Sequence, residues 1–255
     1  MHVRSVGLAT DLELARTRGS VLDRDDYLVV TTPDDPSYYH GNLLVLPAAP
    51  QVGEVAYWTR KFAAELGGNP DVRHVALCWD GIHGDTGALD ELTAAGFTLD
   101  RSVVMVAHTI TAPAVPYEVR PLAARELPAT AELEYADGDV HDDQHRRFLH
   151  RRAAWQQSLV ERDLATFWGA FDGDALVGSL GLVPLGGRAR YQDVQTAASH
   201  RKRGIAGALL AAAAAKVPSA ELVIIAELGS AAERVYQRVG FRAIEHIASA
   251  VRRPS

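Results

Sequence analysis

The sequence predicts an α/β (α+β) protein made of two similar halves, each with helices on both faces of a mixed sheet. The chain has 255 residues, which suits two compact units better than one average domain. A proline-rich connector lies at Thr111–Pro116. A helix-like stretch that ends in Gly-Phe and leads into a strand occurs in both halves, at Ala88–Phe97 and Ala231–Phe241. We therefore expect one unit over residues 1–112 and a second over residues 113–255.

Composition narrows the possible functions. Hydrophobic residues make up 47% of the chain and charged residues 23%, as in globular proteins. The net charge of −6 argues against broad nucleic-acid binding, which needs a basic face. No apolar run approaches the ~20 residues that span a bilayer. Cys78 is the one cysteine, so no internal disulfide forms, as expected in a reducing cytoplasm. We expect a cytoplasmic protein without nucleic-acid or membrane partners.

In the first half, short strands and helices alternate between turn signals. Asp11–Arg18 is predicted to form a short helix with Thr10 as its N-cap and Gly19 as its stop. Strands are expected at Tyr27–Thr32, Leu43–Leu46, Val72–Trp79 and Val103–His108, and further helices at Gly53–Leu66 and Ala88–Ala95.

In the second half, two helices are expected between the first strand and the strands that follow. Its expected order is strand, two helices, three strands, helix, strand, helix and strand. The corresponding segments are Tyr117–Leu122, Ala123–Ala136, His145–Arg162, Ala165–Phe171, Leu176–Pro184, Tyr191–Thr196, Ile205–Lys216, Leu222–Ala226, Ala231–Val239 and Phe241–Val251.

The junction between the Tyr191–Thr196 strand and the helix that starts near Ile205 is the most informative stretch. The first turn of a helix leaves backbone N–H groups without intrahelical partners, and the positive end of the helix dipole favours an anion. Gly204 and Ala206–Gly207 keep side-chain bulk low, so a phosphate can approach the backbone. Arg201–Arg203 add positive charge at the same place. The junction therefore predicts a phosphate site.

This junction also carries a resemblance to a known family. Arg201-x-x-Gly204-x-Ala206 resembles the acyl-CoA signature of the GCN5-related N-acetyltransferase (GNAT) superfamily, a Gln or Arg followed at fixed spacing by Gly and by Gly or Ala. Downstream, the stretch Ala232–Phe241 is similar to the family's helix that carries a tyrosine and ends in Gly-Phe. The first half lacks the signature and looks like a degenerate GNAT half without its own cofactor, as in tandem members of the superfamily. An unrelated α/β domain is the alternative for that half.

The resemblance implies a fold and an activity. It implies two GNAT-like halves, each a mixed, mostly antiparallel sheet flanked by helices, with splayed central strands in the C-terminal half. It implies an enzyme that transfers an acetyl group from acetyl-CoA directly to a primary amine of a small molecule or peptide, with no metal. The alternative is an acyl-CoA-binding regulatory protein or pseudo-enzyme without turnover. The acceptor stays open, and so does a homodimer.

The resemblance also implies where the cofactor binds. The turn amides would hold the pyrophosphate, and the pantetheine would pair with an exposed strand edge. The implied cofactor-binding residues are Val194, Gln195, Thr196, Arg201, Lys202, Arg203, Gly204, Ile205, Ala206, Gly207, Ser230 and Tyr236. The sequence departs from the family at Gly229, where an asparagine is frequent, and at Ala198, where a proline is common.

Candidate catalytic residues follow from the same resemblance. Tyr236 matches the position that often protonates the departing thiolate, although a structural tyrosine packed on the cofactor is the alternative. Asp193 and Glu227 lie on or next to the central strands and are candidates for the base, and a water chain is equally open. A cluster of acidic and imidazole residues could receive a cationic amine or simply face solvent. Its members are Glu132, Glu134, Asp137, His141, Asp142, Asp143 and His145.

Overall fold

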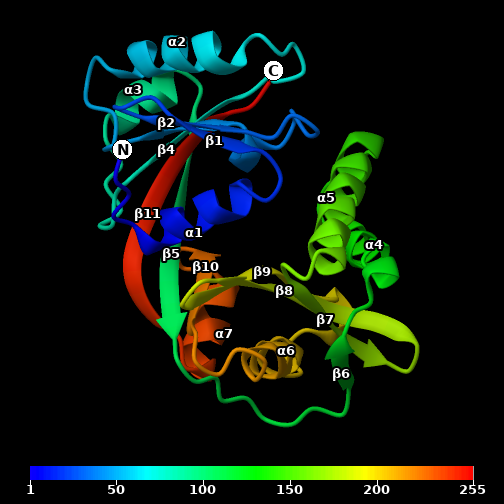
Figure 1. Ribbon diagram of the computed structural model, residues 1–255. Coiled ribbons are helices and arrows are strands. Elements are labelled where there is room, and N and C mark those ends of the chain that lie inside the picture. The colour runs from blue at the N-terminus through cyan, green and yellow to red at the C-terminus, as the bar shows by residue number, and fades with distance from the viewer. Residues whose placement is uncertain (255) are drawn as a thin grey trace. The chain divides into compact units, whose positions relative to one another are not determined.

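The computed structural model describes residues 1–254. Contacts divide the chain into two compact units (Figure 1). Unit 1 holds residues 1–104, 225–228 and the chain from Ala243 onward, whereas unit 2 holds residues 105–224 and 229–242. The first break lies near the expected boundary at 112, but the C-terminal stretch groups with unit 1 rather than with the second half. The reason is pairing: β11 (Arg242–Arg252) runs antiparallel to β4 (Val75–Trp79), with Ser249 opposite Cys78.

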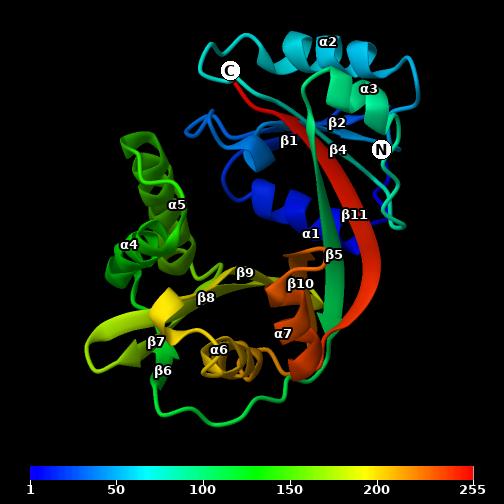
Figure 2. The same cartoon turned by 180° about the vertical axis from the view of Figure 1, so that it is seen from behind.

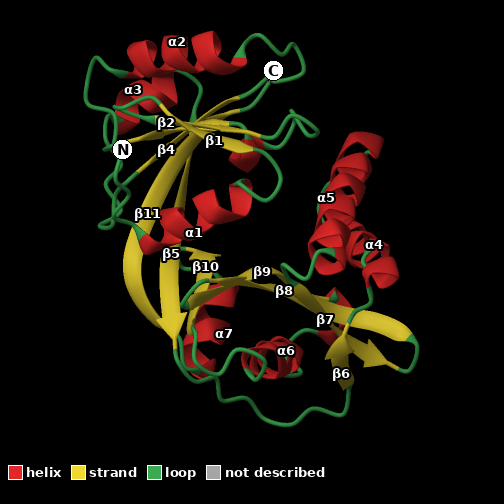
Figure 3. Ribbon diagram, viewed as in Figure 1, coloured by secondary structure: helices red, strands yellow, loops and turns green. Residues whose placement is uncertain are grey.

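Unit 1 has strands with helices on both faces (Figure 3). Its strand order is β1-β2-β3-β4-β11-β5, and all the pairs with a known register are antiparallel except β3 with β4. The remaining elements are α1 (Val6–Ala15), β1 (Ser20–Asp23), β2 (Leu28–Thr31), a 3-10 turn (Tyr39–Gly41), β3 (Leu43–Leu46), α2 (Val55–Leu66), α3 (Leu89–Ala94) and β5 (Thr98–Ala107), whose last residues fall in unit 2.

Alternating side chains of β2 and β3 build two cores in unit 1. Val29 and Leu44 pack with α2 and α3, whereas Val30 and Val45 pack with α1. Successive residues of a strand point to opposite faces of a sheet, so short apolar strands supply both cores.

The first helix starts earlier than its sequence pattern indicates. The helix expected at Asp11–Arg18 instead spans Val6–Ala15. Its N-cap is Ser5, whose hydroxyl oxygen accepts a hydrogen bond from the Leu8 amide at 3.1 Å. Thr10, the expected cap, is buried inside the helix and donates to the carbonyl oxygen of Gly7 at 2.7 Å. Both residues are good caps in isolation, and burial of the earlier turn decides between them.

Unit 2 holds the second set of strands, in the order β10-β9-β8-β7-β6. Helix α6 lies on one face of β7–β9, and α4 and α5 lie on the other face (Figures 1 and 2). The elements are β6 (Glu118–Pro121), a 3-10 turn (Ala124–Glu126), α4 (Pro128–Asp137), α5 (Asp143–Glu161), β7 (Thr166–Asp172), β8 (Ala175–Leu185), β9 (Arg188–Thr196), a 3-10 turn (Ala198–His200), α6 (Ile205–Ala214), β10 (Glu221–Glu227) and α7 (Ala231–Val239).

The parallel pair of unit 2 separates along its length. Strands β9 and β10 pair over only three residue pairs, from Arg188 opposite Glu221 to Arg190 opposite Val223. Beyond Arg190, β9 continues to Thr196 and pairs only with β8 on its other edge, among the residues described. The expected splayed central strands are therefore present, and β9 has a free backbone edge over its last residues. The mixed, mostly antiparallel α/β fold predicted from the sequence is confirmed.

The order of elements repeats in the two halves. Each half runs through three strands, a helix, a strand, a helix and a closing strand. In each, one helix connects a parallel pair: α2 lies between β3 and β4, and α6 lies between β9 and β10. No helix in the described part of the chain combines the length and the apolar character needed to cross a membrane.

Candidate functional site

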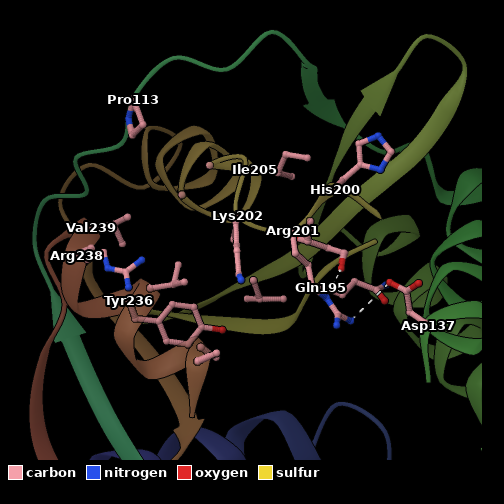
Figure 4. A pocket seen from close by; sticks show the side chains of 18 of the residues that line it. Pro113, Asp137, Gln195, His200, Arg201, Lys202, Ile205, Tyr236, Arg238 and Val239 are labelled. Atoms are coloured by element: carbon pink, nitrogen blue, oxygen red, sulfur yellow. Dashed lines mark hydrogen bonds and ion pairs between the residues drawn. The ribbon is translucent and has the colours of Figure 1, made fainter. Parts of the chain in front are cut away.

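A cavity of about 730 Å³ lies in unit 2, where β9 gives way to α6 (Figure 4). Its walls come from the end of β9, the turn before α6, the first turn of α6, the end of α4 and one side of α7. Ten of the twelve residues expected to bind the cofactor line it. They are Val194, Gln195, Thr196, Arg201, Lys202, Gly204, Ile205, Ala206, Gly207 and Tyr236.

The turn before α6 presents a row of backbone donors. Lys202 and Gly204 adopt left-handed conformations with φ of 64° and 82°. The first intrahelical bond runs from the Ala208 amide to the Gly204 carbonyl oxygen at 3.0 Å. In residues 1–254, the amides from Lys202 to Gly207 have no hydrogen-bond partner. Such a row of free N–H groups at a helix N-terminus binds anions, phosphate above all.

The glycine at the helix start is required by geometry. At Gly204, a Cβ would lie 3.2 Å from Cγ1 of Val115, and the positive φ disfavours any other residue. The sequence pattern that singled out this glycine therefore reflects a backbone conformation.

Cations surround the same end of the cavity. Lys202 and Arg238 line it, and Figure 4 shows the Lys202 side chain pointing into it. Arg201 donates through Nε to the Thr196 carbonyl oxygen at 3.3 Å and lies 3.7 Å from the Asp137 carboxylate. Arg203 does not line the cavity: its guanidinium donates to the Tyr117 hydroxyl at 3.2 Å. The basic turn thus contributes charge chiefly through Arg201 and Lys202.

Tyr236 lies on α7 with its ring in the cavity wall. The side chain is 5% exposed, and its hydroxyl points into the cavity (Figure 4). Burial raises the pKa of Tyr236 to about 12, because the phenolate would be poorly solvated there. The phenol therefore stays protonated near neutral pH and is able to donate a proton or a hydrogen bond.

Besides Arg203, three residues named from the sequence lie outside the cavity wall. Asp193 sits in β9, and its carboxylate accepts a hydrogen bond from Gln156 and faces Arg152. Glu227 is exposed at the end of β10. Ser230 caps α7, where its hydroxyl oxygen accepts from the Glu233 amide at 3.2 Å. These three residues are close in sequence to residues that line the cavity, but they do not line it themselves.

Two carboxylates line the cavity, Glu134 and Asp137. The sequence had placed them only in a broad acidic cluster. Glu134 forms an ion pair with Arg152, and Asp137 accepts from the Ala198 amide besides facing Arg201. Elsewhere in that cluster, Glu132 pairs with Arg146 at 2.9 Å and with His150 at 2.6 Å. Three carboxylates of the cluster, those of Glu132, Glu134 and Asp137, thus face basic side chains. In residues 1–254, no group of three or more His, Cys, Asp or Glu side chains is arranged to hold a metal.

Further lining residues were not among the expected cofactor-binding residues. They are Thr111, Pro113, Gly138, His200, Ala231, Ala232, Val235, Arg238 and Val239. The α7 members could have been found by projecting the tyrosine-bearing helix, because Ala232, Val235 and Val239 lie on the same face as Tyr236.

Comparison with known families identifies the segment that forms most of these walls. Residues 136–250 match the family model for the acetyltransferase (GNAT) domain. This segment of the chain resembles a GNAT acetyltransferase domain. The signature turn and the Gly-Phe helix end both lie inside the matched segment.

Several solved structures share the fold of this chain. A functionally unknown conserved protein from Staphylococcus epidermidis has a TM-score of 0.75 and 11% identity, covering 93% of this chain and 95% of that chain. A GCN5-related N-acetyltransferase from Kribbella flavida has a TM-score of 0.63 and 15% identity, covering 98% and 96%. A tandem GNAT protein from the clavulanic acid biosynthesis pathway has a TM-score of 0.54 and 14% identity, covering 78% and 70%. A search of curated proteins finds no match. At these identities the likeness concerns the fold.

Proposed function

We propose that the GNAT-like domain transfers an acetyl group from acetyl-CoA directly to a primary amine of a small molecule or peptide. The supporting observation is one cavity in unit 2 that joins the free amides of Lys202–Gly207 to the hydroxyl of Tyr236. One end suits a diphosphate, and the other offers a proton donor. A cavity of about 730 Å³ also lies within the range of ~300–1,000 Å³ typical of ligand sites.

The cofactor would use the backbone more than side chains. The pyrophosphate would accept hydrogen bonds from the turn amides, with Lys202 and Arg238 nearby to balance its charge. The pantetheine arm would pair with the free edge of β9 at Val194–Thr196, where β10 has moved away. This route leads the thioester from the turn toward Tyr236.

The reaction would be a direct displacement. The neutral amine nitrogen attacks the thioester carbon, a C–N bond forms, and the C–S bond breaks. Tyr236 would give its proton to the departing thiolate, and holding amine and thioester together would supply much of the rate. The sequence leaves three candidates to take the proton lost by the amine, namely Asp193, Glu227 and a water chain.

A binding protein without turnover is the second candidate. The observation that favours it concerns the carboxylates that could act as a base. Glu134 and Asp137 line the cavity but are ion-paired, and neither Asp193 nor Glu227 lines the cavity. A GNAT domain that has lost its base would still bind acyl-CoA.

Unit 1 would bind no cofactor. Its equivalent junction, between β3 and α2, contains Pro47 and Pro50, which have no N–H group. Two further amides there are already used: Gln51 donates to Glu54 at 2.9 Å, and Gly53 donates to Glu91 at 2.7 Å. Carboxylates thus occupy the position that a phosphate would need, which supports a degenerate GNAT half.

The test combines calorimetry with a thiol-release assay. We expect one acetyl-CoA to bind per chain, and free thiol to appear when a panel of primary amines is added. Gly204→Val should abolish binding, because valine disfavours the φ of 82°. Gly187→Ala is the matched control, since a Cβ there meets nothing within 4 Å. Binding without thiol release would favour the second candidate, and unchanged affinity in the Gly204→Val protein would reject the cofactor site.

A further inference from the structure

Strand β9 departs from regular geometry immediately before the cavity. Across the β8–β9 ladder, Ser179 faces Gln195 and Gly181 faces Gln192. Between these two pairs β8 has one residue, Leu180, whereas β9 has two, Asp193 and Val194. This mismatch is a β-bulge in β9. Asp193 has a φ of 48°, in the left-handed region that few residues other than glycine occupy, although Asp is among those that tolerate it.

The carboxylate of this bulged residue is held from α5. Nε2 of Gln156 donates to Oδ2 of Asp193 at 2.7 Å, and Nη1 of Arg152 lies 3.5 Å from Oδ1. Gln156 is only 2% exposed and lies in the buried stripe of α5 with Leu149, Ala153 and Leu159. A polar side chain buried at such a position is costly unless it is hydrogen-bonded. Asp193 supplies that partner.

The same arginine reaches the cavity wall. Arg152 pairs with Glu134 on α4 as well as with Asp193 on β9. Glu134 and Val194 both line the cavity. One guanidinium therefore connects the α4 wall to the strand that carries the free edge.

We propose that Asp193 is a positioning residue, which with Gln156 and Arg152 fixes the bulge and so aims the backbone of Val194–Thr196 at the cofactor. It is not the proton acceptor, because both of its oxygens face donors on α5. This inference deepens the proposed acyl transfer and rests on it for its kinetic consequences. The bulge and its anchor are properties of the chain itself and can be tested separately.

Three substitutions at one position distinguish positioning from proton transfer. Asp193→Asn keeps an oxygen for Gln156 and tolerates the left-handed conformation, so we expect kcat and KM within about threefold of wild type. Asp193→Gly adopts the same φ without the anchor and should be intermediate. Asp193→Ala has neither property and should raise KM for acetyl-CoA about tenfold or more, because small misplacements of a site are costly. If all three variants lose kcat equally, and the acidic limb of the pH–rate profile disappears with them, Asp193 is the base and the inference is wrong.

The anchor on α5 gives a second, independent series. Gln156→Met removes the amide at similar volume and should raise KM in the same direction as Asp193→Ala. In the Asp193→Ala background it should add little, since residues of one network are not additive. Gln157→Met is the matched control: its side chain bonds to Glu161 at 2.8 Å on the exposed side of α5. Full additivity of the first two changes would contradict a shared role.

Amide hydrogen exchange measures how firmly the bulge is held, and it needs no ligand. We expect faster exchange of the amides in residues 191–197 in Asp193→Ala and Gln156→Met than in wild type or Gln157→Met. Unchanged exchange in both variants would overturn the inference, even in a fully active enzyme. If wild type binds no acetyl-CoA, the proposed function fails, and the exchange comparison still decides the role of Asp193.

Discussion

The hydroxyl of Tyr191 on β9 donates a hydrogen bond of 2.8 Å to the carbonyl oxygen of Leu210 on α6. Both residues are buried. The bond connects the two elements that flank the turn before α6, one on each side. The angle between strand and helix, and hence the direction of the turn amides, is fixed from within the core as well as by the turn itself.

Replacing this tyrosine tests the connection. Tyr191→Phe removes one buried hydrogen bond and should reduce the free energy of unfolding by about 1 kcal/mol. Acetyl-CoA should also bind more weakly, because the turn is less firmly held. Urea denaturation and calorimetry measure the two effects. Tyr57→Phe, at an exposed tyrosine of unit 1, should change neither. If the variant is less stable but binds acetyl-CoA with unchanged affinity, the Tyr191–Leu210 hydrogen bond does not influence the site.

The role of Tyr236 predicts a specific kinetic pattern. Tyr236→Phe removes the hydroxyl and keeps the ring, so kcat should fall by about 10²-fold or more while KM for acetyl-CoA changes little. If wild type and Tyr236→Phe have equal kcat values, the hydroxyl of Tyr236 is not the proton donor and the side chain only packs in the site.

The raised pKa of Tyr236 has a consequence for pH dependence. A phenol with a pKa near 12 keeps its proton below that pH. The wild-type rate should therefore show no alkaline loss from this group between neutral pH and about pH 10, the pKa of an ordinary tyrosine. A falling limb centred near pH 10 that disappears in Tyr236→Phe would contradict the assignment.

Acid stability should depend on Glu126, at the start of the helical region of unit 2. Its carboxylate accepts from Arg120 at 2.8 Å and from the Ala123 amide at 2.8 Å. The Arg120 hydrogen bond, foremost, lowers the pKa of Glu126 to about 2. A lowered pKa stabilises the folded state above the unfolded-state pKa, near 4.5, and this contribution is lost as the pH falls toward 2.

The corresponding experiment follows unfolding across that pH range. Glu126→Gln should lose less stability than wild type between about pH 5 and pH 2. Asp174→Asn, at an exposed hairpin turn, serves as control and should follow the wild-type curve. Parallel curves for Glu126→Gln and wild type would show that the ion pair is not formed in solution.

In unit 1, the first helix should depend on the last strand. Glu245 of β11 accepts hydrogen bonds from the Ser5 hydroxyl at 2.7 Å and the Val6 amide at 2.8 Å. Glu245→Ala leaves these buried donors without an acceptor and should cost about 2–4 kcal/mol of unfolding free energy. Glu13→Ala, on the exposed side of the same helix, should cost less than about 0.5 kcal/mol. Similar costs in thermal denaturation would refute the anchoring role of Glu245.

Local signals explain what the sequence predicted well. Helix α7 was expected at Ala231–Val239 and spans those residues, because Ser230 caps its start and Gly240 ends it at a φ of 117°. The small and basic residues before α6 predict a phosphate site there, and the structure shows that Gly204 in this turn has a left-handed φ of 82°.

Long-range contacts explain what the sequence did not reveal. The assignment of the C-terminal strand to unit 1 depends on pairing between β11 and β4, which are far apart in the chain. The bulge at Asp193 breaks the alternation by which strand faces are inferred, so its contact with Gln156 is invisible in the sequence. The true start of α1 depends on Glu245, more than two hundred residues away.

The most direct test follows the turn amides themselves. In ¹⁵N-labelled protein, titration with coenzyme A should shift the backbone amide signals of Lys202–Gly207 strongly, with smaller shifts along Val194–Thr196. The junction of unit 1 at Gln51–Gly53 should not respond. If coenzyme A leaves the Lys202–Gly207 signals in place, or shifts the unit 1 junction instead, the phosphate-binding turn is wrong and the proposed acetyl transfer loses its basis.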